Sequence, residues 1–114
     1  KVKEHGSSFL KDATLGIIVC GDDTKSDVWT EDCSIASIVV QLTAQSLGLG
    51  SCWIQIRKRA HSQDTTAEEY IQNLLGIPTN FKVESIISIG YPAETNKPMP
   101  QQSLEFEKIR YNHY

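Results

Sequence analysis

The alternation of apolar and polar residues predicts three strands and two helices, followed by a polar arm. A nearly continuous β-branched run over residues 13–20 is typical of a strand covered on both faces, and Gly21-Asp22-Asp23 supplies the turn that ends it. Residues 50–56 and 83–89 predict the second and third strands. The third strand would place three apolar residues on one face: Val83, Ile87 and Ile89. The order strand, helix, strand, helix, strand is an α/β pattern.

The first predicted helix is apolar on more than one face. Thr30 is placed to cap its N-terminus, Glu31 and Asp32 follow where the helix dipole favours carboxylates, and Gly48 is placed to end it. Its apolar residues are Ile35, Ile38, Val39, Val40, Leu42, Ala44 and Leu47. Such a helix must be buried by several neighbours, and the other predicted elements supply too little cover. The mismatch indicates missing chain, a dimer interface, or both.

The second predicted helix has clear signals at both ends. Thr66-Ala67-Glu68-Glu69 has the form of a capping box, and Gly76 and Pro78 stop the helix. Its amphipathic face is formed by Ala67, Tyr70, Ile71, Leu74 and Leu75. The loop before it, residues 57–64, begins with Arg57-Lys58-Arg59, the only tight cationic cluster, which we expect to be solvated.

After the third strand the chain becomes an arm. Residues 93–103 are rich in Pro, Asn, Lys and Gln, which favours an extended segment. Residues 104–114 carry spaced hydrophobic side chains that we expect to dock on another surface: Phe106, Ile109, Tyr111 and Tyr114.

Composition narrows the class of protein. The 114 residues suggest one domain, and a net charge of −3 argues against nucleic-acid binding. No apolar run approaches the roughly 18 residues that span a bilayer. Cys20, Cys33 and Cys52 form no C-x-x-C, so neither a disulfide framework nor a metal site is indicated, and buried reduced thiols of a cytoplasmic protein are expected. The start at Lys1, without Met, indicates a processed or partial chain.

Sequence signatures of catalysis are absent. The chain contains no phosphate-binding P-loop, no G-x-S-x-G and no H-E-x-x-H. Gly48-Leu49-Gly50 lies between a helix and a strand, the reverse of the order in a dinucleotide-binding fold. No residue is therefore marked as a catalytic nucleophile, acid or base.

The informative stretch is residues 30–56. Asp32, Ser34 and Ala36 open the first helix, and Leu47-Gly48-Leu49-Gly50 and Cys52-Trp53-Ile54 follow it. Two later blocks come in the same order: Leu75-Gly76-Ile77-Pro78 and Ile86-Ile87-Ser88-Ile89-Gly90-Tyr91-Pro92. In order and spacing, these blocks together resemble the nitroreductase family.

The resemblance implies an α+β fold, of which residues 1–114 are a single C-terminal portion: a central sheet, a long buried helix and an extended arm over residues 92–114. It also implies a homodimer that holds FMN at its interface and passes electrons from NADH or NADPH to nitroaromatics, quinones or similar acceptors. Because the flavin performs the hydride chemistry, the protein itself needs no catalytic acid or base.

The resemblance also assigns site residues. Trp53, Ile54, Gln55 and Ile56 match the segment beside the flavin ring, and main-chain N–H groups near Gln55 and Ile56 would face its N5/O4 edge, where a donor stabilises the charge of the reduced ring. The residues alone also fit a strand end with a core tryptophan. Lys97 matches a position from which family members reach the FMN phosphate, although a solvated lysine fits equally well.

Members of the family carry, near the start of the domain, an Arg-x-Ser-x-Arg block whose arginines hold the FMN phosphate, and residues 1–114 contain no such block. The N-terminal part of the family domain is thus expected to be absent and FMN binding impaired. Two other functions stay open, a non-enzymatic module that binds a flavin or another small ligand and a pure dimerisation domain. No motif selects NADH over NADPH.

Overall fold

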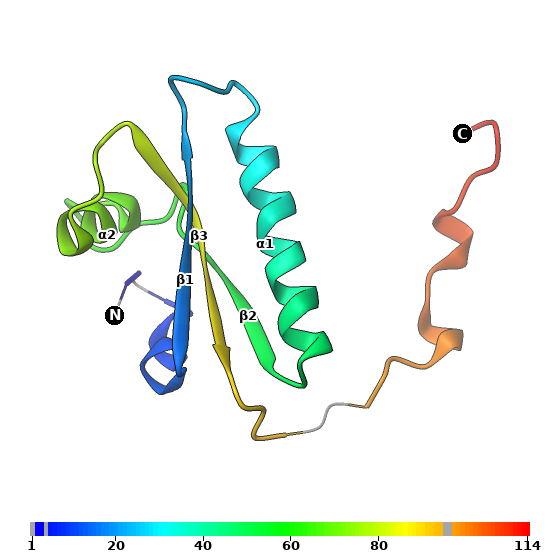
Figure 1. The fold of residues 1–114 in the computed structure, drawn as a ribbon. Helices are drawn as coiled ribbons and strands as arrows, with labels where there is room; N and C mark the ends of the chain where they lie inside the picture. Colours follow the sequence, from blue (N-terminus) through cyan, green and yellow to red (C-terminus); the bar gives the residue numbers. More distant parts are fainter. Residues whose placement is uncertain (1, 4, 95–96) are drawn as a thin grey trace.

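Three antiparallel strands form one sheet with a helix on each face (Figure 1). The computed structural model describes residues 2–3, 5–94 and 97–114. The strands are β1 (Leu15–Asp22), β2 (Gly50–Gln55) and β3 (Phe81–Gly90), in the order β1-β3-β2. α1 (Trp29–Ser46) and α2 (Ala67–Leu75) lie on opposite faces. The antiparallel pairing confirms an α+β fold and corrects the α/β pattern, because β3 inserts between the two earlier strands.

Each face of the sheet carries its own apolar layer. The layer under α2 consists of Val2, Ile54, Ile56, Ala67, Ile71, Val83 and Ile86. The layer under α1 consists of Ala44, Ile87 and Ile89, with Ile17, Val19, Val40, Leu49 and Trp53 packed against it. Since successive residues of a strand face opposite sides, β2 turns Ile54 towards α2 and Trp53 towards α1.

A bulge in β3 corrects one sequence prediction. Val19 pairs with Ser85 and Cys20 pairs with Val83, so Glu84 is an extra residue on β3. The extra residue reverses the alternation of faces. Val83 therefore lies in the layer under α2, whereas Ile87 lies in the layer under α1. The prediction that the two side chains share one face is wrong.

The predicted N-terminal cap of α1 is also wrong. The helix begins at Trp29, one residue before Thr30, and Val28 at the cap position makes no side-chain hydrogen bond. Trp29 instead packs closely against Gly21 of β1, with the Arg57 guanidinium 5.6 Å from its ring centroid. Tertiary packing of this side chain thus outweighs local capping preference.

The signals around α2 are confirmed. The Thr66 hydroxyl accepts from the Glu69 N–H, and the Glu69 carboxylate accepts from the Thr66 N–H, which completes the capping box. Gly76 ends the helix in the left-handed region with φ 67°. Gly48, which follows α1, has φ 73°.

The outer face of α1 has no cover within the described chain. Five large apolar side chains are between 49% and 71% exposed: Ile35, Ile38, Val39, Leu42 and Leu47. A short helical turn, η1 (Ser8–Asp12), precedes β1. Among the described residues, no helix is both long and apolar enough to span a bilayer.

The arm leaves the body after β3 and projects away from it (Figure 1). Residues 97–114 are exposed throughout and contain only two short turns, η2 (Gln101–Ser103) and η3 (Phe106–Lys108). Residues 95–96 of the predicted arm lie outside the described residues.

Candidate functional site

The open edge of β2 offers a main-chain hydrogen-bond donor at Gln55. Within the described residues β2 pairs with β3 alone, and the Ile56 N–H just beyond the end of β2 donates to the Glu84 carbonyl at 3.1 Å. Because successive N–H groups of a strand point in opposite directions, those of Trp53 and Gln55 point to the unpaired edge. Two main-chain N–H groups are expected beside a flavin. The Gln55 N–H thus lies at the open edge, whereas the Ile56 N–H is already hydrogen-bonded to β3.

The side chains of this segment are fixed by a polar network. The Trp53 indole N–H donates to the Gln55 Oε1 at 2.9 Å. The Gln55 Nε2 donates to the Arg57 carbonyl at 3.2 Å and to the Glu84 carboxylate at 3.4 Å. Ile54 and Ile56 are fully buried under α2, so neither offers its side chain to a ligand.

Glu84 is a buried carboxylate behind this network. Only 4% of the residue is exposed, and its Oε2 has no hydrogen-bond partner in the part of the chain that the structure describes. The Arg57 Nε lies 3.9 Å from that oxygen. Burial raises the pKa of the Cys33 thiol, and the carboxylates of Glu84 and Asp32 raise it further. The bulge thus places a negative charge directly behind Gln55 and Arg57.

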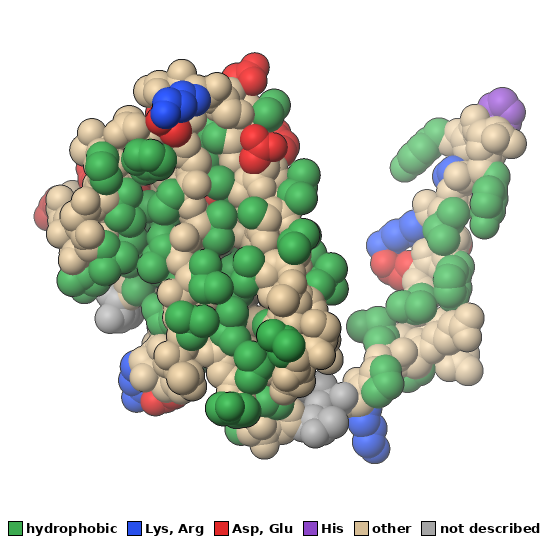
Figure 2. All heavy atoms as spheres, in the orientation of Figure 1, with side chains coloured by type: hydrophobic (Ala, Val, Ile, Leu, Met, Phe, Trp, Pro, Cys, Tyr) green, Lys and Arg blue, Asp and Glu red, His purple; other side chains and the backbone are tan. Residues whose placement is uncertain are grey.

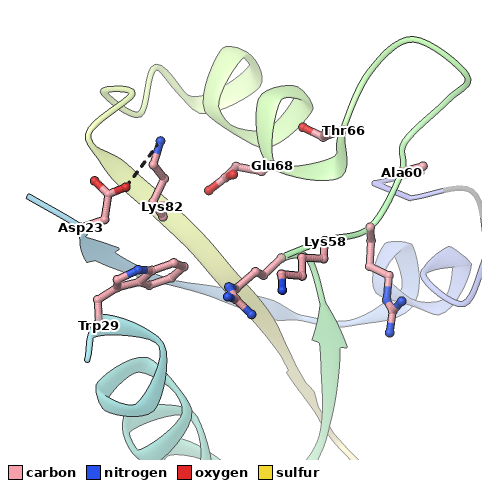
Figure 3. A pocket seen from close by; sticks show the side chains of 9 residues that line it. Asp23, Trp29, Lys58, Ala60, Thr66, Glu68 and Lys82 are labelled. Carbon is pink, nitrogen blue, oxygen red and sulfur yellow. Dashed lines mark ion pairs between the residues drawn. The ribbon is translucent and has the colours of Figure 1, made fainter. Parts of the chain in front are cut away.

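A cleft of about 500 Å³ opens beyond the end of β2, between the first turns of α1 and α2 (Figure 3). Its lining residues are Asp23, Trp29, Arg57, Lys58, Arg59, Ala60, Thr66, Glu68 and Lys82. Arg57 is half-buried against Trp29 and Glu84, which corrects the expectation that the whole cationic cluster is solvated. Lys58 and Arg59 are exposed as expected.

Lys97 is not brought to the other predicted site residues in the described chain. It lies in the exposed arm, which leaves β3 after Gly90. Gly90 pairs with Gly50, at the opposite end of β2 from Gln55. A contact of Lys97 with a cofactor phosphate stays a prediction.

Trp29 and Glu84 belong to this site, although neither is predicted from the sequence. A carboxylate between Val83 and Ile86 in an otherwise apolar strand was the available signal, since a charge in such a run is either paired or functional. Cys52 was also misjudged: it is exposed, whereas Cys33 is buried and Cys20 is half-buried. Among the described residues, no group of three or more His, Cys, Asp and Glu side chains is arranged to hold a metal ion.

Comparison with known proteins identifies the family. The nitroreductase family model matches residues 2–91. Two relatives carry the name NADH dehydrogenase/NAD(P)H nitroreductase. The one from Archaeoglobus fulgidus is 38% identical over 90 residues, which cover 75% of this chain and 49% of the relative. The one from Methanothermobacter thermautotrophicus is 40% identical over 97 residues, which cover 82% of this chain and 48% of the relative.

A solved structure gives the same answer. An FMN-dependent nitroreductase from Clostridium difficile superposes with a TM-score of 0.94 at 43% identity, covering 99% of this chain and 66% of that one. The chain thus spans about half the length of these two curated relatives. Sequence and fold agree that the chain belongs to the nitroreductase family.

Proposed function

We propose that the chain is part of an FMN-dependent oxidoreductase that takes electrons from NADH or NADPH and reduces nitroaromatics, quinones or similar acceptors. The observation that carries the proposal is the open edge of β2, where the Gln55 N–H is unpaired and the Trp53 side chain beside it is fixed. The names of the relatives support the flavin and the nicotinamide donor in general terms. A cytoplasmic location also stays a prediction.

The residues at this edge fit a flavin. When bound, FMN supplies the hydride chemistry. The Gln55 N–H would donate to the N5/O4 edge of the ring, and a fixed donor there stabilises the negative charge that reduction creates. The hydrogen bonds of the Gln55 side chain to Trp53, Arg57 and Glu84 hold the donor in place.

We propose that a second copy of the chain covers the outer face of α1. A groove of about 300 Å³ runs between α1 and β1, and its lining is almost entirely apolar: Leu15, Ile17, Val39, Val40, Thr43, Ala44, Leu47, Leu49 and Ile89. Figure 2 shows apolar side chains both on the body and along the arm. Exposed apolar patches of this kind are typical of protein interfaces. The arm offers matching side chains, all exposed: Met99, Leu104, Phe106, Ile109, Tyr111 and Tyr114.

The phosphate of FMN is the part of the cofactor for which residues 1–114 supply least. Lys97 is the predicted contact, and no Arg-x-Ser-x-Arg block occurs within these residues. Bidentate guanidinium contacts are strong phosphate ligands. We therefore expect residues 1–114 alone to bind FMN more weakly than a chain that carries such a block.

The experiment that tests the flavin contact removes one N–H group. Gln55→Pro deletes the main-chain donor at an edge where proline is tolerated, and Gln55→Ala keeps the donor while losing the same side chain. With FMN bound, we expect the flavin midpoint potential of Gln55→Pro to fall below that of Gln55→Ala by roughly 30 mV or more, since a hydrogen bond to a charged group is lost. Equal potentials in the two variants would contradict the assignment of Gln55.

A further inference from the structure

The cleft beyond β2 carries positive charge that the chain does not neutralise. It is lined by four cationic side chains, Arg57, Lys58, Arg59 and Lys82, and by two acidic ones, Asp23 and Glu68. Asp23 lies 3.9 Å from the Lys82 Nζ, and these two charges offset each other. Glu68 accepts the Val83 N–H at 2.7 Å, which fixes its carboxylate without neutralising it.

Lys58 and Arg59 are the uncompensated cations. Within the described part of the chain neither has an ion-pair partner, whereas Arg57 is shared with the buried Glu84. Figure 3 shows Lys58 and Trp29 on one side of the cleft, with Glu68 of α2 and Thr66 just before that helix across from them. With Glu68 as the one acidic side chain of the lining that has no cationic partner among the described residues, the two unpaired cations leave the cleft with a net positive charge that suits a phosphate.

The turn that carries these cations is held in a fixed conformation. The Arg59 N–H donates to the Ile56 carbonyl at 3.0 Å, and the Arg59 carbonyl accepts from the Ala67 N–H of α2 at 2.8 Å. Between them Lys58 has φ 57°, a left-handed conformation that is uncommon for lysine and clusters at ligand sites. A backbone fixed at both ends presents the two side chains at little ordering cost on binding.

The position of the cleft indicates which phosphate it would take. The cationic turn directly follows Gln55, the residue proposed to face the flavin. The arm with Lys97, the proposed contact for the FMN phosphate, leaves from the other end of the sheet, where Gly50 pairs with Gly90. A second phosphate-bearing ligand beside the flavin would be the electron donor.

We propose that this cleft binds the 2′-phosphate of the dinucleotide electron donor and thereby selects NADPH over NADH. The inference rests on the proposed function, in which a nicotinamide dinucleotide delivers the electrons. Lys58 supplies a point charge to the phosphate, and Arg59 supplies a planar, bidentate donor.

The test measures binding and turnover separately, on the FMN-loaded protein. Isothermal titration calorimetry reports on occupancy of the cleft, with 2′,5′-ADP and 5′-AMP as probes. We expect Lys58→Ala and Arg59→Ala each to weaken 2′,5′-ADP binding about tenfold and to leave 5′-AMP nearly unchanged, and Arg59→Lys to retain most of the affinity. Lys108→Ala, which removes a cation from the arm, should change neither.

Turnover should follow the same pattern. The KM for NADPH should rise about tenfold in the two alanine variants, while the KM for NADH stays the same. Unchanged 2′,5′-ADP binding in both variants would overturn the inference. A loss of FMN affinity without a loss of 2′,5′-ADP binding would assign these cations to the cofactor phosphate and would also overturn it. If neither nucleotide reduces the flavin, the proposed function fails, and the 2′,5′-ADP measurement still decides the cleft.

Discussion

The Gln55 side-chain amide donates to the Glu84 carboxylate at 3.4 Å, from the edge strand to the bulge of the central strand. The same side chain accepts the Trp53 indole N–H. One residue therefore connects the core tryptophan of β2 with a buried charge on β3. The geometry of the strand end depends on this connection.

Replacing Gln55 by Leu should destabilise the fold. The change leaves the half-buried Trp53 N–H without its partner and removes a donor from Glu84, and each group left unsatisfied costs about 1–3 kcal/mol. Urea denaturation followed by circular dichroism would measure the free energy of unfolding. Gln63→Leu, in the exposed loop before α2, is the matched control, and equal stability of the two variants would contradict the role of Gln55.

The Thr66–Glu69 capping box should make stability depend on pH. Hydrogen bonds from the Thr66 N–H and then from its hydroxyl lower the pKa of Glu69 below its ordinary value of 4.5. A carboxyl whose pKa is lower in the folded state stabilises the fold above pH 4.5, and that contribution is lost as the pH falls through the lowered pKa. Thr66→Ala should lower the free energy of unfolding by about 1 kcal/mol at neutral pH. The difference in free energy of unfolding between this variant and the parent should become smaller in acid.

Thermal unfolding between neutral pH and pH values below the ordinary Glu69 pKa checks this expectation. Thr79→Ala, an exposed threonine without a side-chain hydrogen bond in the described chain, is the control. If the difference in melting temperature between Thr66→Ala and the parent stayed constant with pH, Glu69 would not be coupled to the cap.

Gly21 should tolerate no side chain. A Cβ there would lie 2.9 Å from the Trp29 Cβ and 3.2 Å from the Cys33 Sγ, so α1 would have to move away from β1. We expect Gly21→Ala to lower the free energy of unfolding by about 1–3 kcal/mol. In the same strand, Gly16→Ala meets nothing closer than 3.5 Å and should be neutral or slightly stabilising. The two changes having the same effect would contradict the packing of Trp29.

The outer face of α1 should decide the oligomeric state. Leu42 is 62% exposed in the single chain and lies on the face proposed to meet a second copy. A carboxylate there would be buried without a partner, so Leu42→Glu should convert dimer to monomer in light scattering. Leu74 on α2 is 61% exposed but lies away from that face, and Leu74→Glu should leave the dimer intact. A parent protein that is monomeric at all concentrations would refute the interface.

The elements that the sequence predicts well are those whose signals are local. The Thr66–Glu69 pair and Gly76 each lie within one helical turn of the end of α2 that they define. The sequence therefore predicts the bounds of α2 almost to the residue. The residues of the family blocks also gave the correct fold. By contrast, the start of α1 depends on how Trp29 packs against Gly21 of β1, a tertiary contact between a helix and a strand.

The parts that could not be predicted depend on pairing between distant strands. The bulge at Glu84 exists only in the register of β3 with β1, and it alone moves Val83 to the other face. The direction of the Gln55 N–H follows from β2 being at the edge of the sheet, which the order of elements along the chain does not reveal. The cleft likewise joins Lys58, Glu68 and Lys82 from three separate segments.

The most direct test of the account is an anaerobic titration with NADPH in saturating FMN. We expect the protein to bleach the oxidised flavin absorbance much faster than free FMN is bleached, and a nitroaromatic added afterwards to restore the absorbance. Flavin that stays oxidised, or that is bleached no faster than free FMN, would contradict the assignment of this chain to a nicotinamide-driven flavin oxidoreductase.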